Sequence, residues 1–373
     1  MKVIKLHDFR TLQVDQTRMA CFAGTRAVSD QFGRKLRDLR ISVTDRCNLR
    51  CRYCMPKSVF TKDYAFLPRD ALLSFAEIER IAKVAVANGV EKIRLTGGEP
   101  LLRKNIEALI ERLSALRTPD GRHVEIAMTT NGILLASKAQ TLKAAGLSRV
   151  TVSLDALDDT LFRYISDSEA NVRDVLAGIF AAQAAGLGPV KVNMVVKRGT
   201  NDIELVPMAR RFKGTGVILR MIEYMDVGGT NEWVRDEVLP SAEVIQRIHE
   251  QFPLQAVASS DASETATRWA YRDGSGEIGM ISSVTGAFCD SCTRARLSAN
   301  GKMYLCLFAS NGYDMRSLLR SGIDDVALSA SMRQIWQSRD DNYSKEREGQ
   351  SHKDVPDEQK STPKRIEMSY IGG

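Results

Sequence analysis

The sequence predicts an α/β protein: an incomplete (β/α)6 TIM-type barrel followed by a smaller C-terminal region, with a doubly wound sheet as the alternative. From Leu39 to about Glu223, short runs rich in β-branched residues alternate with longer segments of helical periodicity. Six such βα units are fewer than the eight of a closed barrel, which favours an open or partial one. The chain has 373 residues, 43% of them hydrophobic and 27% charged, so it can bury a core of this size.

The predicted strands and helices alternate in a regular order. The strands are residues 39–43, 92–96, 124–129, 149–154, 190–196 and 216–223, and the helices between them are residues 75–88, 105–116, 137–145, 171–185 and 202–212. Glycine follows several of the helical patterns, as at Gly89, Gly146 and Gly186, and ends a helix there because it adopts the left-handed conformation at little cost. In either architecture, ligands bind at the carboxyl ends of the strands.

The chain divides into four predicted regions. These are an N-terminal extension at 1–38, the partial barrel at 39–240, a C-terminal region at 241–337, and a polar linker and tail at 338–373. A helix at residues 241–252 opens the C-terminal region, and a strand-and-turn stretch follows at 269–282. Between residues 338 and 365, Val355 is the only aliphatic residue, so we expect a flexible linker there rather than a helix.

The charge balance favours an anionic partner. The 53 Lys and Arg residues exceed the 46 Asp and Glu residues and give a formal net charge of +7, although a solvated basic surface would give the same balance. Aromatic residues do not interleave with the basic runs, so a nucleotide-like small molecule fits this balance at least as well as a nucleic acid. We predict no nucleic-acid partner.

The sequence predicts a cytoplasmic protein with no membrane association. No stretch approaches the ~18 consecutive apolar residues of a membrane span. The first residues contain no apolar segment typical of a secretory signal, and Asp8, Asp15 and Asp30 interrupt the arginines that a mitochondrial presequence would need. In a reducing compartment, clustered thiols usually bind metal.

The first cysteine group follows the first predicted strand directly. Cys47, Cys51 and Cys54 have CxxxCxxC spacing, so their thiolates converge in one loop, whereas Cys21 stands alone. A [4Fe–4S] cluster normally takes four cysteines, so three ligands leave one iron free for another group, such as the amino and carboxylate groups of S-adenosylmethionine (SAM). The alternatives are a zinc site with a distant fourth ligand and a ferredoxin-like cluster, but both prefer CxxC pairs or a fourth nearby cysteine.

The second cysteine group has a two-plus-one arrangement, with 13 residues between Cys292 and Cys306 and with Cys289 as the third member. A structural zinc would need a fourth ligand, and the nearest histidine, His249, lies 40 residues before Cys289. Zinc therefore stays the second interpretation. Two separate three-thiolate groups favour a second iron–sulfur cluster, whose open iron could hold a ligand atom of the substrate.

Cations on the predicted strands form a second pattern. Arg294 and Arg296 are two residues apart, which places both guanidinium groups on one face of a strand. Exposed edge positions could explain one or two such cations. The whole set is better explained by an anionic ligand such as a triphosphate, since a buried unpaired charge is costly. The set comprises Arg40, Arg94, Lys191, Arg220, Arg294 and Arg296.

Three further turns fall at the carboxyl ends of strands. In the TGGEP segment at 96–100, paired glycines allow a close backbone approach, and Glu99 is suited to accept hydrogen bonds from an ammonium group. Taken alone, this segment could equally be an ordinary tight turn. The segment at 129–132 and Ser153 lie at the carboxyl ends of the third and fourth predicted strands, at the same level of the sheet as the TGGEP segment. They could also belong to ordinary turns.

The motifs together resemble those of the radical SAM superfamily and, within it, the GTP 3′,8-cyclase family of molybdenum cofactor biosynthesis. The segments that carry this resemblance are DLRISVTDRCNLRCRYCMP at 38–56, IRLTGGEPLLR at 93–103, FCDSCTRARLSANGKMYLC at 288–306 and the final Gly372-Gly373. The resemblance implies a lyase that converts GTP to (8S)-3′,8-cyclo-7,8-dihydro-GTP in the first step of that pathway. A 5′-deoxyadenosyl radical would take the ribose C3′ hydrogen, and the resulting carbon radical would attack guanine C8.

The resemblance also implies a role for each matched residue. Two [4Fe–4S] clusters and SAM are the implied cofactors, with the first cysteine group on the cluster that cleaves SAM and the second on a guanine-facing cluster. The implied SAM contacts are Tyr53, Gly98, Ser153 and Met225. The implied GTP contacts are Arg40, Arg94, Thr129, Lys191, Arg220, Arg294 and Arg296. The implied catalytic set is Arg294, Arg296, Gly372 and Gly373, because the double-glycine tail enters the active site in this family; a terminal GG could otherwise be only a frayed end.

The implied partners are GTP, an electron donor and the downstream cyclic pyranopterin monophosphate synthase, and a homodimer is compatible with the family. The segment before Arg40 and the polar stretch from 338 to 365 are both longer than is usual in the family. Another radical SAM enzyme with an auxiliary cluster, such as a peptide maturase, is the enzyme alternative. A zinc-stabilised or electron-transfer binding protein is the non-enzymatic one.

Overall fold

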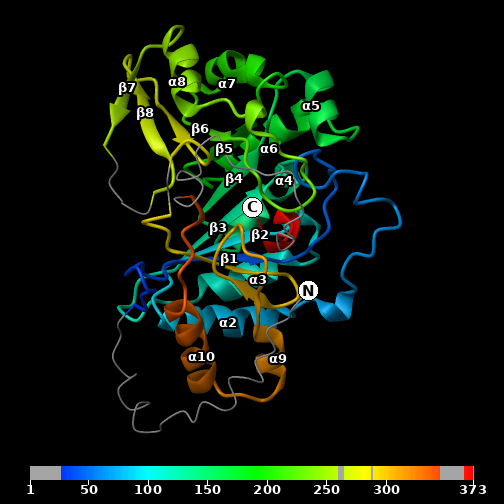
Figure 1. The fold of residues 1–373 in the computed structure, drawn as a ribbon, viewed down its shortest axis with the longest axis vertical. Helices are drawn as coiled ribbons and strands as arrows, with labels where there is room; N and C mark the ends of the chain where they lie inside the picture. Colours follow the sequence, from blue (N-terminus) through cyan, green and yellow to red (C-terminus); the bar gives the residue numbers. More distant parts are fainter. Residues whose placement is uncertain (1–26, 259–263, 287–288, 345–364, 373) are drawn as a thin grey trace, which may run out of the picture.

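The computed structural model of the chain describes residues 27–258, 264–286, 289–344 and 365–372, and the six predicted strands are present in it (Figure 1). These strands are parallel, and each lies beside the next one along the chain. They are β1 (Asp38–Ser42), β2 (Lys92–Thr96), β3 (Glu125–Thr130), β4 (Arg149–Ser153), β5 (Lys191–Val196) and β6 (Ile218–Glu223).

Helices follow the strands as predicted, with one addition. Helix α5 (Asp159–Ser166) lies in the connection after β4, and the Asp158 carboxylate caps its first turn by accepting from Leu161 N at 2.7 Å. At the start of the first predicted helix, Ser74 and Glu77 form a reciprocal capping box. The predicted helices are α2 (Phe75–Ala87), α3 (Ile106–Ser114), α4 (Leu135–Ala144), α6 (Val172–Ala184) and α7 (Leu205–Phe212).

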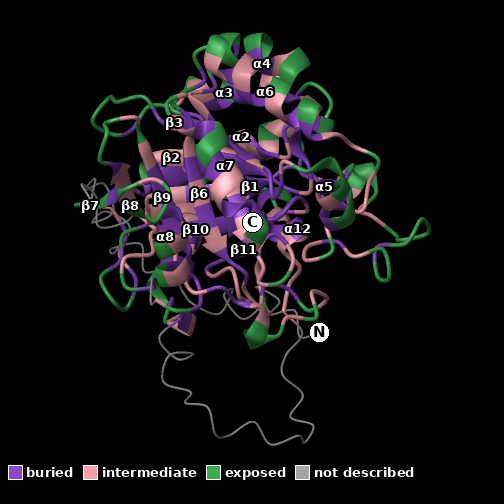
Figure 2. Cartoon of the chain, turned by 90° about the horizontal axis from the view of Figure 1, so that it is seen from above, coloured by how far each residue is buried: buried purple, intermediate pink, exposed green. Residues whose placement is uncertain are grey.

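The two faces of the sheet differ in character. Leu39 and Ile41 of β1 are fully buried in the same hydrophobic cluster as Ile78 and Ile81 of α2. Figure 2 shows buried residues over the strands and exposed residues on the outer sides of α4 and α6. Arg40, which alternates with these apolar residues, faces the opposite side because successive side chains of a strand point to opposite faces. One face therefore forms the core, and the other is free to carry polar chemistry.

The C-terminal region extends the same sheet at both edges. Strand β10 (Arg294–Leu297) pairs in parallel with β1, and β9 (Glu277–Ile281) pairs in parallel with β6. Antiparallel strands lie outside them and leave the 12-stranded sheet open. The outer strands are β7 (Leu254–Val257), β8 (Thr267–Tyr271), β11 (Lys302–Tyr304) and β12 (Tyr313–Asp314). The partial barrel is confirmed. Its extension at both edges by strands from beyond residue 240 was not predicted, and the domain boundary near residue 240 stays a prediction.

Among the described residues, the other α-helices are α8, which opens the C-terminal region as predicted, and three later ones. They are α8 (Ser241–His249), α9 (Met315–Arg320), α10 (Asp325–Gln337) and α12 (Met368–Ile371). The predicted flexible linker differs from the structure at its start, because Arg339 is buried and forms ion pairs and hydrogen bonds. Val28 and Leu36 of the predicted extension are also buried. Most of the linker, residues 345–364, lies outside the described residues, as does Cys21.

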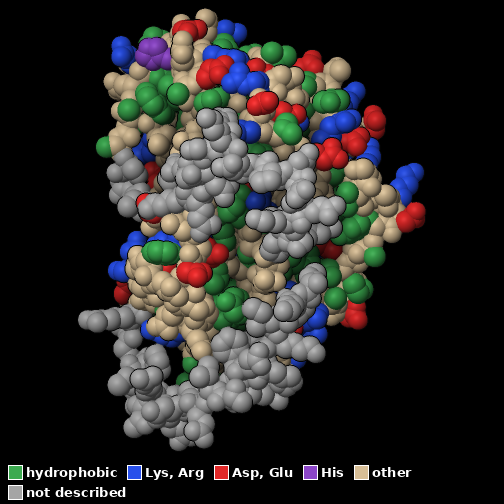
Figure 3. All heavy atoms as spheres, in the orientation of Figure 1, with side chains coloured by type: hydrophobic (Ala, Val, Ile, Leu, Met, Phe, Trp, Pro, Cys, Tyr) green, Lys and Arg blue, Asp and Glu red, His purple; other side chains and the backbone are tan. Residues whose placement is uncertain are grey.

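Charges of both signs mix on the one face of the molecule that Figure 3 draws. On the face drawn in Figure 3, Lys and Arg side chains are interspersed with Asp and Glu. Within the described residues, no helix combines the length and the apolar character that crossing a membrane would require.

Candidate active site

The first cysteine loop packs directly on the glycine-rich turn after β2. Gly98 N donates to Thr44 O at 2.9 Å, and Glu99 N donates to Arg46 O at 2.8 Å. A Cβ atom on Gly98 would lie 2.3 Å from Arg46 O, so only glycine permits this approach. In the structure, Gly98 thus fixes the loop that begins at Cys47, and its contact with SAM stays a prediction.

Glu99 has a role that the sequence analysis did not anticipate. Its buried carboxylate accepts from Thr130 Oγ1 at 2.8 Å and from Asn131 N at 2.7 Å. Burial raises the pKa of Glu99 to about 7, although these hydrogen bonds oppose the shift. Asn131 in turn donates to Asn48 Oδ1 at 2.7 Å. The carboxylate therefore ties the turn after β3 to the turn after β2, and through Asn131 to the cysteine loop.

Tyr53 anchors the other end of the cysteine loop. Its hydroxyl donates to Asp155 Oδ2 at 2.8 Å, and Asp155 Oδ1 accepts from Val195 N at 2.8 Å. The loop is thereby attached to the ends of β4 and β5. Burial raises the pKa of Asp155 to about 6, even though both hydrogen bonds favour the carboxylate. No signal in the sequence linked Asp155 to Tyr53.

The three thiols of the first group form a buried set of mutually repelling charges when ionised. Burial raises the pKa of Cys47 to about 11, and burial followed by the neighbouring Cys54 raises the pKa of Cys51 well above its usual value. Such thiolates persist only beside bound cationic metal, so the donor set fits an iron–sulfur cluster. In the described part of the chain, no three or more His, Cys, Asp or Glu side chains are arranged to hold a single metal ion. A cluster does not need that arrangement, because each cysteine binds a different iron.

The predicted cations gather on the polar face of the sheet. Arg40 lies between Arg94 of β2 and Arg296 of β10 in the strand register. Burial, followed by repulsion from Arg296 and Arg294, holds the pKa of Arg40 well below its usual value. Asp38 on β1 offsets only part of that repulsion. Within the described residues, Arg40 Nε and Arg94 Nε are buried without a hydrogen-bond partner. Buried unsatisfied guanidinium donors indicate an anionic ligand.

The other predicted GTP contacts continue across the same face. Arg94 Nη1 donates to Thr129 Oγ1 at 3.2 Å. Lys191 and Arg220 lie on β5 and β6, and burial is the main cause that lowers their pKa values to about 8 and about 9. A Cβ atom on Gly279 of β9 would lie 2.9 Å from Arg220 Cγ, so this glycine leaves room for the arginine.

Arg149 of β4 is a further cation that the sequence analysis missed. It forms an ion pair with Glu125 and contributes to the lowered pKa of Arg220, after burial and Arg94. The signal was present, because Arg149 stands four residues before Ser153 in the same strand and therefore on the same face. Ser153 itself is half-buried at the carboxyl end of that strand.

The tail reaches the same face. Arg296 Nη1 donates to Gly372 O, and α12 contacts β1. Gly372 has a φ of +76°, and a Cβ atom there would lie 2.2 Å from Thr96 Cγ2. Both the conformation and the contact require glycine. The structure thus places Gly372 between β2 and β10, whereas Gly373 lies outside the described residues.

The tail is held in place near Met225. Arg365 forms an ion pair with Asp226 at 2.7 Å, and the Glu367 carboxylate accepts from Gly229 N at 3.1 Å and from Thr230 Oγ1 at 2.9 Å. All of these partners lie in the loop after β6. Met225 is the second residue of this loop and is half-buried.

The second cysteine group adjoins the cationic face through β10. Cys292 N donates to Cys289 O at 3.1 Å, and Arg294 follows two residues after Cys292. Burial alone would raise the pKa of Cys292, but the guanidinium groups of Arg294 and Arg339 outweigh it and lower the pKa to about 6. Burial raises the pKa of Cys306 to about 12. The same register that aligns Arg294 with Asp38 brings this group beside β1.

The open parallel sheet with a three-cysteine loop at its carboxyl edge defines a radical SAM enzyme. The model of the Radical SAM superfamily matches residues 41–212, and that of Molybdenum Cofactor Synthesis C matches residues 217–345. Across 94% of its length, the chain is 47% identical to the whole of a GTP 3′,8-cyclase from Acidothermus cellulolyticus. It is also 45% identical to a GTP 3′,8-cyclase from Xanthomonas axonopodis pv. citri, over 94% of this chain and 100% of the relative. The identity to a GTP 3′,8-cyclase from Staphylococcus aureus JH9 is 45% as well, over 93% of this chain and 99% of the relative. The chain belongs to the GTP 3′,8-cyclase family.

A solved structure shares the fold. Streptococcus suis SuiB bound to S-adenosylmethionine superposes with a TM-score of 0.57 at 15% identity, over 92% of this chain and 74% of that one. At this identity the likeness concerns the fold alone. Membership of the radical SAM superfamily implies SAM and an iron–sulfur cluster as cofactors.

Proposed function

We propose that the chain converts GTP to (8S)-3′,8-cyclo-7,8-dihydro-GTP in the first step of molybdenum cofactor biosynthesis. One observation carries the proposal: a row of three guanidinium groups, from the buried Arg296 and Arg94 and the half-buried Arg40 between them, lies in register across three strands of one sheet face. The first cysteine loop follows β1, and the second group precedes β10. An anionic nucleotide bound to this row therefore lies between the two groups.

Each cysteine group would hold one [4Fe–4S] cluster. Cys47, Cys51 and Cys54 would hold the first, and the second would be held by Cys289, Cys292 and Cys306. When bound, the first cluster supplies the electron for reductive cleavage of SAM, from which the hydrogen-abstracting radical derives. In each group, three protein ligands leave one coordination position for a small molecule.

The residues of the chain bind and orient the two small molecules. Arg40, Arg94, Arg294 and Arg296 would donate charge-assisted hydrogen bonds to the triphosphate. Thr129, Lys191 and Arg220 extend this surface toward β6. SAM would contact Tyr53, Gly98, Ser153 and Met225, which lie in the cysteine loop, in the turn after β2, in β4 and in the loop after β6.

The tail would complete the site. Gly372 occupies the space beside Thr96, and its carbonyl accepts from Arg296. Arg296 is thereby oriented by the tail, and the tail covers the carboxyl edge of β2, where exclusion of water protects a radical. Gly373, which lies outside the described residues, is included by its place in the family motif. The catalytic set is then Arg294, Arg296, Gly372 and Gly373.

The reaction needs partners beyond GTP. We propose an electron donor and, downstream, cyclic pyranopterin monophosphate synthase, with the reaction taking place in the cytoplasm; a homodimer is compatible with this scheme.

The proposed function is tested by anaerobic incubation of the reconstituted protein with GTP, SAM and dithionite. Mass spectrometry is expected to detect 3′,8-cyclo-7,8-dihydro-GTP together with 5′-deoxyadenosine. If 5′-deoxyadenosine forms while GTP is recovered unchanged, another substrate must be sought. If neither product forms although iron and sulfide are bound, the radical SAM assignment fails for this chain.

Replacement of one guanidinium group should weaken nucleotide binding. Arg40→Met removes a charge-assisted donor whose contribution is roughly 1.5–3 kcal/mol, so the affinity for GTP should fall by about 10- to 100-fold in equilibrium dialysis. Arg112→Met on α3 is the matched control, because Arg112 is already paired with Glu79 on the helical layer that covers the other face of the sheet. Equal affinities of the Arg40 variant and the control would contradict the phosphate assignment.

GTP binding should also depend on pH through Lys191. Burial, followed by repulsion from Arg220, lowers the pKa of Lys191 to about 8. A bound triphosphate favours the ammonium form, so binding requires the proton and the affinity should fall as pH rises above about 8. Lys191→Arg keeps its charge across this range and should flatten the profile. A profile identical in the two proteins would exclude Lys191 as the titrating group.

A further inference from the structure

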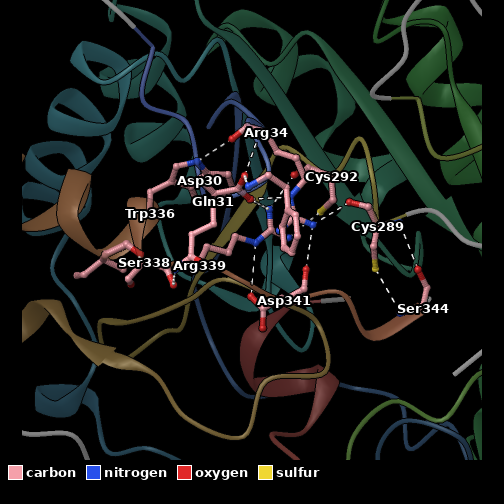
Figure 4. A network of polar contacts seen from close by, with 12 residues as sticks. Asp30, Gln31, Arg34, Cys289, Cys292, Trp336, Ser338, Arg339, Asp341 and Ser344 are labelled. Atoms are coloured by element: carbon pink, nitrogen blue, oxygen red, sulfur yellow. Dashed lines mark hydrogen bonds and ion pairs between the residues drawn. The ribbon is translucent and has the colours of Figure 1, made fainter. Parts of the chain in front are cut away.

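A buried network joins the segment before β1 to the segment after α10 at the second cysteine group (Figure 4). Asp30 and Arg34 precede β1, and Arg339 follows α10. Asp30 Oδ2 lies 2.5 Å from Arg34 Nε and 3.4 Å from Arg339 Nη1. The three side chains are at most 3% exposed. One carboxylate is thus shared by two guanidinium groups away from water.

Both arginines extend from Asp30 to the cysteines. Arg34 Nη1 donates to Cys289 O at 2.9 Å, and Arg339 Nη1 donates to Cys292 O at 2.8 Å. Arg339 Nη2 also donates to Cys292 Sγ at 3.3 Å. A single planar guanidinium therefore holds both the backbone and the sulfur of Cys292.

Several contacts fix the direction of these donors. Trp336 Nε1 donates to Arg34 O at 2.9 Å, and Arg339 lies over the Trp336 ring, 4.8 Å from its centroid. Gln31 N donates to Arg339 O at 3.3 Å. The first and last of these contacts fix the backbone of each arginine, while the ion pairs with Asp30 hold both side chains, so the donors are oriented before any ligand binds.

The charges of the network call for an anion. Asp30, Arg34 and Arg339 together carry a net charge of +1, and buried charges are stable only when they are paired. Asp341 lies 3.4 Å from Arg339 Nε but is partly exposed, and Arg294 adds a further positive charge at Cys292. The Cys292 thiolate is therefore the natural partner of the buried triad. The reduced form of a cluster carries one more negative charge, which a nearby guanidinium stabilises further.

We propose that Arg339, held by Asp30, is a positioning residue that orients the Cys292 thiolate and raises the reduction potential of the second cluster. The inference rests on the second cluster of the proposed function. It assigns a role to the segment before β1 and to the first residues after α10, because Asp30 and Arg339 lie 309 residues apart and act as one unit.

The test is a redox titration of the full chain, reconstituted anaerobically and followed by electron paramagnetic resonance. The second-cluster signal is the one that Cys51→Ala retains and Cys292→Ala loses. Arg339→Gln removes the charge and should shift this signal to a lower potential. Arg339→Lys restores the charge without the two-pronged geometry and should recover part of the shift. GTP-independent formation of 5′-deoxyadenosine should stay unchanged, because the first cluster does not contact this network.

Asp30→Asn separates positioning from charge alone. Loss of a nearby negative charge should by itself raise the potential, whereas release of Arg339 from Cys292 should lower it. We expect the lower value. Arg80→Gln is the matched control, since Arg80 pairs with Asp325 at the opposite end of α10, and it should leave the potential unchanged.

The outcomes are distinguishable. An unshifted second-cluster signal in Arg339→Gln, or a higher potential in Asp30→Asn, would overturn the positioning role while leaving the proposed function intact. A wild-type protein whose iron and sulfide content corresponds to a single cluster would overturn both the second cluster and this inference. If Arg339→Gln does not fold, the potentials measured for Arg339→Lys and Asp30→Asn test the positioning role instead.

Discussion

Cys51→Ala is expected to form no 5′-deoxyadenosine above the enzyme-free background. The Cys51 carbonyl accepts from Cys54 N at 2.9 Å and from Met55 N at 2.8 Å, and alanine keeps both bonds. The loop should therefore keep its shape and lose only one thiolate ligand, which leaves the first cluster incomplete. The measurement is chromatography of the nucleoside after anaerobic incubation with SAM and dithionite.

Cys21→Ala is the control, since Cys21 stands apart from both cysteine groups in the sequence. It should form 5′-deoxyadenosine at the wild-type rate. Retained formation in Cys51→Ala would mean that Cys51 is not a cluster ligand. The electron paramagnetic resonance signal of the second cluster should persist in Cys51→Ala, and its presence would show that this variant has folded.

Gly372→Ala is expected to suppress cyclisation of GTP and to leave SAM cleavage in place. At a φ of +76°, alanine is strained by roughly 1–2 kcal/mol, and its Cβ would collide with Thr96 Cγ2 at 2.2 Å. The inserted tail should become less populated by about 10- to 100-fold. The yield of cyclised product per 5′-deoxyadenosine should fall accordingly, as measured by mass spectrometry.

A second substitution tests the cause. Thr96→Ser removes the methyl group that the new Cβ would meet, so the double variant should recover part of the yield, although the strained conformation persists. Full cyclisation by Gly372→Ala alone would remove the tail from the mechanism. Loss of 5′-deoxyadenosine as well would show that the substitution had damaged the first cluster rather than the tail.

Much of the fold could be read from local patterns. The six strands from β1 to β6 were predicted because short runs of apolar and β-branched residues indicate a buried strand, whichever strand they pair with. Helix α5 was missed because its eight residues are short, although Asp158 is a typical capping residue. The parallel pairing of β9 and β10 with the edges of the barrel could not be predicted, because a strand does not encode which edge it joins.

The site was predicted unevenly for the same reason. The cysteines and the strand arginines are recognisable by spacing and by residue type. Glu99 links two turns of the site because its carboxylate accepts hydrogen bonds from Thr130 and Asn131, which lie at the carboxyl end of β3. Its own segment of sequence does not reveal these partners. The start of the polar stretch has the composition of a flexible linker, yet Arg339 is buried there because Asp30 neutralises part of its charge.

By itself, the sequence determined the chemistry available to this protein: two sets of three thiolates, a series of cations on strands and a glycine-ended tail. Only the tertiary structure decided that Arg296 lies beside Arg40, that Gly372 lies against Thr96, and that Asp30 reaches Arg339. The physical reason is that local patterns record what each segment can form. The stability of a buried charge, however, depends on partners that only the folded chain brings within a few ångströms.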